Sequence, residues 1–160
     1  DMQAVKDSFY MALRQRLAQS FPTRTMGDTA QPALVVCENV SESWAPANDV
    51  FYLRWTADEQ LPADASAAGW RALQCELTYR TAGTESANGE DRGRALAELD
   101  REIQSILEPR QTALLDYTQQ SPAALNATLL WTRATLDLAK DSGGAVQRTA
   151  HMSVLWQEAQ

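Results

Sequence analysis

The residues best suited to chemistry in this chain are Ser142 and the single histidine, His151, which lies nine residues further on. A serine nucleophile needs a positioned histidine base and a carboxylate that orients the base. Ser142 is preceded by Asp141 but followed by Gly143 and Gly144, a composition typical of a hairpin turn. We therefore predict a turn at 140–144, and a polar position on a strand for His151, with no catalytic role for either.

Other site chemistries find equally little support. Glycines at 83 and 89 match neither GxGxxG nor GxxxxGK[ST], so we expect no nucleotide site. One histidine and the distant pair Cys37 and Cys75 match no zinc spacing. We expect both cysteines to be buried thiols, with a disulfide across adjacent strands as the alternative. The acidic residues of 90–102 follow one helix and are typical of a solvated face. We predict no metal, no cofactor and no enzymatic activity.

The composition of the chain favours a single domain over residues 1–160. The net charge of −7 disfavours binding to nucleic acid and to anionic membranes. No apolar run approaches the roughly 20 residues that cross a bilayer, and no signal peptide is visible. The expected location is the cytoplasm.

Hydrophobic periodicity predicts two helices, at 2–19 and 91–107, and five strands, at 33–40, 50–56, 70–81, 127–138 and 146–156. The intervening residues 57–69 and 110–126 are expected to be an exposed loop and a connector. The predicted fold is α+β, in the order α-β-β-β-α-β-β. Two helices would cover one face of a two-layer, mainly antiparallel sheet.

The uncovered face of that sheet is predicted to be polar. It would carry Gln74, Glu76, Thr78, Thr149 and His151, and would be either hydrated or an interface. Five tryptophans are many for this length. We expect most of them in the core, while Trp44, in a proline-containing loop, is a candidate anchor for a partner.

The chain resembles the phage tail terminator family, of the minor tail protein U type. The likeness rests on the element order and on an ordered set of segments, each weak alone: FYMALRQRL, PALVVCENV, VFYLRW, CELTYRTAG, DRGRALAELDREI and LLWTRA. It implies a structural subunit of a phage or prophage that forms a ring, often a hexamer. Such a ring caps the tail tube and joins the tail to the head. The resemblance gives no family match for the loops 41–49 and 57–69, which would set ring contacts.

This resemblance implies that the partners are other copies of the chain, the tail tube and the head connector. The expected place of assembly is the bacterial host cytoplasm, and later the virion tail. We predict subunit contacts at Trp44, Arg54, Glu76, Arg80, Arg92 and Arg94. The alternatives are another phage neck or tail-tube connector, and a small ligand-binding domain with a pocket around Glu76, Tyr79 and His151.

Overall fold

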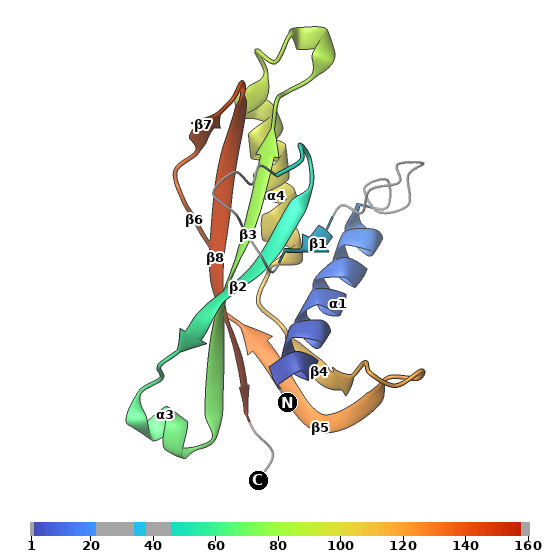
Figure 1. Ribbon diagram of the computed structural model, residues 1–160, viewed down its shortest axis with the longest axis vertical. Coiled ribbons are helices and arrows are strands. Elements are labelled where there is room, and N and C mark those ends of the chain that lie inside the picture. Colours follow the sequence, from blue (N-terminus) through green and yellow to red (C-terminus); the bar gives the residue numbers. More distant parts are fainter. Residues whose placement is uncertain (1, 22–33, 38–45, 158–160) are drawn as a thin grey trace.

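The computed structural model describes residues 2–21, 34–37 and 46–157. This part of the chain forms a mixed α/β fold, with eight strands in one curled sheet that resembles half of a barrel, and three α-helices (Figure 1). The predicted five-stranded sheet with two helices is therefore wrong in its number of strands and helices and in its element order.

The helices are α1 (Met2–Ser20), α3 (Ala63–Ala67) and α4 (Arg92–Ile106), with a 3₁₀ turn at Glu85–Ala87. The strands are β1 (Leu34–Val36), β2 (Phe51–Glu59), β3 (Trp70–Thr81), β4 (Gln111–Asp116), β5 (Ala123–Trp131), β6 (Thr135–Leu136), β7 (Lys140–Ser142) and β8 (Ala145–Gln157).

Strands β3 and β8 form the central pair of the sheet. The order is β1-β2-β3-β8-β5-β4, and every pairing is antiparallel except that of β1 with β2. Along the side of β8 away from β3, three strands pair in succession: β5 with residues 154–156, β6 with 150–151 and β7 with 145–147. One long strand therefore has neighbours on both sides for most of its length.

The predicted strand 127–138 is broken at Thr132. The Thr132 amide donates to the Ser153 carbonyl, while its side-chain Oγ1 accepts from the Ser153 amide, both at 2.9 Å. Because a side chain takes the place of a backbone carbonyl, the chain leaves the ladder at this point, and pairing resumes only at β6. The exposed Arg133 lies in this interruption.

The predicted loop, connector and turn also contain regular structure. Residues 57–69 hold the end of β2 and the short helix α3, and 110–126 hold β4 and the start of β5. The predicted turn at 140–144 includes β7, which leaves Gly143 and Gly144 as its tip, both with positive φ. These segments lack a long hydrophobic repeat. Their structure therefore depends on pairing with the neighbouring strands.

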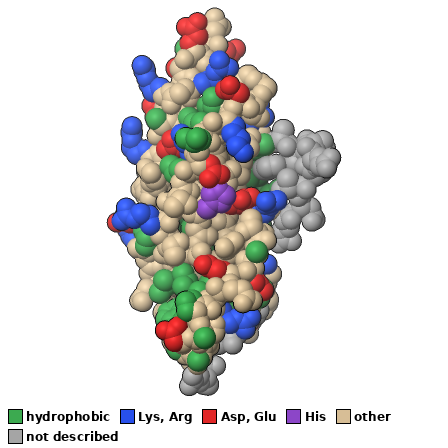
Figure 2. Space-filling view, turned by 90° about the vertical axis from the view of Figure 1, so that its left-hand side faces the viewer, with side chains coloured by type: hydrophobic (Ala, Val, Ile, Leu, Met, Phe, Trp, Pro, Cys, Tyr) green, Lys and Arg blue, Asp and Glu red, His purple; other side chains and the backbone are tan. Residues whose placement is uncertain are grey.

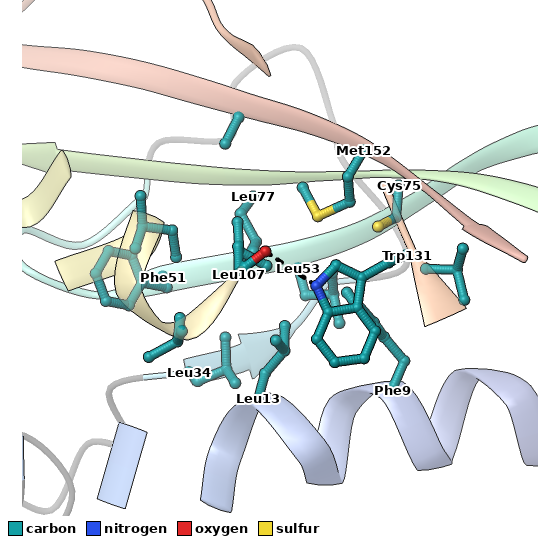
Figure 3. Close-up of a cluster of buried hydrophobic side chains, with 14 of the residues drawn as sticks. Phe9, Leu13, Leu34, Phe51, Leu53, Cys75, Leu77, Leu107, Trp131 and Met152 are labelled. Carbon is teal, nitrogen blue, oxygen red and sulfur yellow. Dashed lines mark hydrogen bonds between the residues drawn. The ribbon is translucent and has the colours of Figure 1, made fainter. Parts of the chain in front are cut away.

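The core lies between the sheet and helices α1 and α4 (Figures 1 and 3). Phe9 of α1 meets Trp131 of β5 edge-to-face, with ring centroids 5.2 Å apart. Trp131 Nε1 donates to the Leu107 carbonyl at 3.0 Å, which satisfies both groups in the core (Figure 3). Cys75 is a buried thiol in the same cluster, and Cys37 is a half-buried thiol.

Candidate functional site

The face of the sheet opposite the core, which we call the outer face, brings ionisable residues from several strands together. Strand register places Arg54 beside Glu76, Glu76 beside His151, and His151 beside Thr135. Paired residues of neighbouring strands project from the same face, so these side chains lie in one line across the sheet. With Asp137, which follows β6, the residues Arg54, Glu76 and His151 form what we call the charged row.

The charged row is continuous. Arg54 Nε and Nη2 lie 2.9 Å and 2.8 Å from Glu76 Oε1. Oε2 of Glu76 lies 3.7 Å from His151 Nδ1, and His151 Nε2 lies 2.8 Å from Asp137 Oδ2. The imidazole is thus placed between two carboxylates. Because the members keep contact with solvent, the pairs add little to stability and mainly define the charge pattern of this surface.

Two hollows flank the charged row. The smaller, about 190 Å³, lies toward β1, and the larger, about 330 Å³, lies at the break between β5 and β6. Figure 2 shows the histidine near the middle of this face, with acidic and basic side chains beside it. The smaller hollow is lined by Cys37, Tyr52, Arg54, Glu76, Thr78, Gln147 and Thr149. The larger is lined by Thr56, Gln74, Cys75, Thr132, Arg133, Thr135, His151, Met152 and Ser153.

Further along the strands the outer face becomes apolar. Ala72 pairs with Leu155, and Leu155 pairs with Leu130, while Trp70 projects from the same face two residues before Ala72. Trp70, Leu130 and Leu155 are half-buried and Ala72 is buried. We call these four residues the apolar row, and apolar side chains gather over the lower part of the face in Figure 2. An apolar area bordered by charged residues is the usual anatomy of a protein interface.

The chemistry of the outer face is that of hydrogen bonding. Hydroxyl, amide and guanidinium groups line the larger hollow and are able to bind a polar group. Among the residues that the structure describes, no three His, Cys, Asp or Glu side chains are grouped to hold a metal ion.

No known protein-family model matches this chain. A search of curated proteins likewise finds no similar sequence. In the described ranges, no helix is long and apolar enough to cross a membrane.

The six residues predicted at subunit contacts are distributed over separate places. Arg54 and Glu76 meet in the charged row. Arg80 Nη2 donates to the Ser142 carbonyl at 3.1 Å, and Arg92 Nη1 donates to the Gly144 carbonyl at 2.7 Å. These last two arginines therefore hold the β7–β8 turn within the same chain.

The remaining two predicted contacts are Arg94 and Trp44. Arg94 is exposed near the start of α4, close to Asp91. The Thr84 amide and hydroxyl both donate to the Asp91 carboxylate at 2.8 Å, and they hold its pKa below the usual value. Trp44 lies outside the described residues.

The pocket predicted around Glu76, Tyr79 and His151 is not formed, because Tyr79 projects from the core face. Its hydroxyl donates to Asp100 Oδ1 at 2.6 Å, and Arg148 Nε donates to the same oxygen at 2.9 Å. Burial, followed by this hydrogen bond, raises the pKa of the Tyr79 hydroxyl. Tyr79 therefore belongs to a hydrogen-bonded group that links β3, α4 and β8.

Sequence reasoning missed Asp137, Arg133 and the apolar row. The predicted strand 127–138 contains both Asp137 and Arg133 without interruption, whereas the break at Thr132 brings them to the outer face. A signal did exist for Leu155, which falls on the same face of the strand as Thr149, His151 and Ser153 and so interrupts the polar side of β8.

Proposed function

We propose that this protein is a structural subunit that associates with copies of itself in a ring of the tail terminator kind, in a phage or prophage. Such a ring would cap a tail tube and present a docking surface to the head. Assembly would take place in the bacterial host cytoplasm.

The observation that carries the proposal is the combination of the charged row and the apolar row on one sheet face. The helices α1 and α4 pack on the opposite face, so they leave these side chains, apart from the buried Ala72, in contact with solvent. Apolar side chains supply association free energy when they are buried, and charged neighbours fix the partner and its orientation. A surface of this composition favours a binding role for the protein.

The shape of the subunit is consistent with extended contacts. The β2–β3 end with α3 and the β3–α4 connection project from opposite ends of the sheet (Figure 1). Projections of this kind extend the surface that one subunit offers to its neighbours.

The proposal is tested by measuring the mass of the purified protein across a wide concentration range, with negative-stain images of the largest species. Closed rings with a fixed number of copies are expected. Open tubes would instead favour the tail-tube alternative, and a monomer of 17.7 kDa at every concentration would exclude self-assembly.

A second candidate function is binding of a small polar ligand in the hollow of about 330 Å³ beside His151. Its hydroxyl and guanidinium groups favour a hydrogen-bonding ligand. Screening small polar compounds by thermal shift, with His151→Ala and Arg133→Ala as controls, tests this candidate. A compound that stabilises the wild type but neither variant would support it.

A further inference from the structure

Leu138 stands out on the surface of the subunit. Its exposed fraction is 88%, whereas the other large exposed apolar residues of the described chain, Met2 and Val36, are each 37% exposed. It lies between β6 and β7, at the side of the sheet formed by their pairing with β8.

The position of Leu138 is fixed by the residue before it. The Asp137 amide donates to the Thr149 carbonyl at 3.0 Å, its carbonyl accepts from Arg148 Nη1, and its carboxylate meets His151 Nε2 at 2.8 Å. Two backbone contacts and one side-chain contact hold Asp137 in place, and the next side chain extends into water. Leu138 is thus presented on a supported backbone, which lowers the entropic cost of binding through it.

We propose that Leu138 of one copy packs on the apolar row of a second copy. This inference rests on the proposed self-assembly and names its contact. Within one chain the two features are far apart: Asp137 pairs at Thr149, six residues from Leu155 on β8, which is about 20 Å along an extended strand. Leu138 therefore contacts the apolar row only when that row belongs to another copy.

Charges beside the two features are complementary. Lys140, two residues after Leu138, is exposed. Glu59 of β2 pairs with Ala72 and therefore lies beside the apolar row. The Glu59 side chain is half-buried, so it gives this end of the row a negative charge, opposite in sign to that of Lys140.

This contact joins two different surfaces of the same chain. Such a heterologous contact leaves one unused Leu138 and one unused apolar row on every pair of copies, so further copies are added, and they form a ring when the rotation between copies closes. The arrangement agrees with the proposed ring and makes a specific prediction for mixtures of variants.

The test uses Leu138→Asp and Leu155→Asp, with Ser105→Asp, at an exposed position near the end of α4, as the matched control for added charge. Masses are measured by light scattering after thermal melts have shown that each variant is folded. We expect each of the two leucine variants alone to lose assembly and remain at 17.7 kDa. An equimolar mixture should form a species of twice that mass and nothing larger, because only one intact contact can form. Ser105→Asp should assemble like the wild type.

A charge exchange covers the case in which Leu155→Asp does not fold. Lys140→Glu and Glu59→Lys should each weaken assembly, and the double variant should restore it. The inference is overturned if the wild type assembles and Leu138→Asp assembles equally well, or if the double variant fails to recover. A wild type that never assembles contradicts the proposed function itself, so the two failures are distinguishable.

Discussion

The Ser8 side chain of α1 forms hydrogen bonds with both backbone polar groups of Leu115 at the edge of the sheet. Its Oγ accepts from the Leu115 amide at 3.0 Å and donates to the Leu115 carbonyl at 3.3 Å. Leu115 lies next to the irregularity in the β4–β5 register, and the Ser8 side chain is buried. A helix hydroxyl thereby closes a sheet edge that would otherwise offer unpaired groups to another strand.

Replacing Ser8 by alanine should lower the free energy of unfolding by about 1–3 kcal/mol, because both groups of Leu115 lose their partner. Urea denaturation checks this value, with Ser20→Ala at the exposed end of α1 as the control. A change below about 0.5 kcal/mol for Ser8→Ala, the range usual for surface substitutions, would show that water replaces the hydroxyl.

Two glycines give opposite predictions for the same substitution. Gly83 has φ +78°, and a Cβ there would lie 2.5 Å from Asp91 Oδ1 and 3.0 Å from Gly89 Cα. Gly83→Ala should therefore destabilise the protein by about 1–3 kcal/mol. A Cβ at Gly93, in α4, meets no atom within 4 Å, so Gly93→Ala should stabilise it by about 0.5–1 kcal/mol. Thermal melts of the two variants would contradict this account if their shifts had the same sign.

Stability should fall as the pH rises above about 8.5–10, where thiols and phenols of an unfolded chain ionise. Burial raises the pKa of Cys75, with the nearby Glu76 adding to the effect, and burial also raises the pKa of Tyr79. The folded protein then keeps protons that the unfolded chain releases, so unfolding becomes more favourable with increasing pH. Urea midpoints measured from neutral to alkaline pH should decline less in a Tyr79→Phe, Cys75→Ala double variant. Equal declines in the two proteins would disprove the assignment.

Arg94 offers the cleanest test of a contact on α4. Arg94→Glu should weaken self-assembly without changing the stability of the monomer, because the side chain is exposed. Arg92→Glu is unsuitable, since Arg92 holds the Gly144 carbonyl at 2.7 Å. Arg101→Glu, also exposed on α4, provides the same charge change elsewhere on the helix. Light scattering that shows equal assembly for Arg94→Glu and wild type would remove Arg94 from the interface.

The parts of the fold that were predictable from sequence are those with a long period. The stripe of Leu96, Leu99 and Ile103 indicated α4, and the alternation around Cys75 and Leu77 indicated β3 at 70–81, the range that the structure gives. Strand β4 and helix α3 have six and five residues, too few for a period to be distinguished from loop composition.

The candidate site was predictable only in part, for a similar reason. Glu76 and His151 were expected on the polar face, but their alignment with Arg54 depends on cross-strand register. The place of Asp137 depends on the break at Thr132, where a threonine hydroxyl accepts a strand amide. Nothing in the residue types of 127–138 indicates that the Thr132 hydroxyl replaces a backbone carbonyl as hydrogen-bond acceptor.

The most direct test of the account is the mass of the wild-type chain in solution, measured by sedimentation equilibrium across a wide concentration range. Self-assembly through the outer face predicts a discrete multiple of 17.7 kDa that is reached as concentration rises and then stays constant. A protein that remains at 17.7 kDa over the whole range would contradict the central claim.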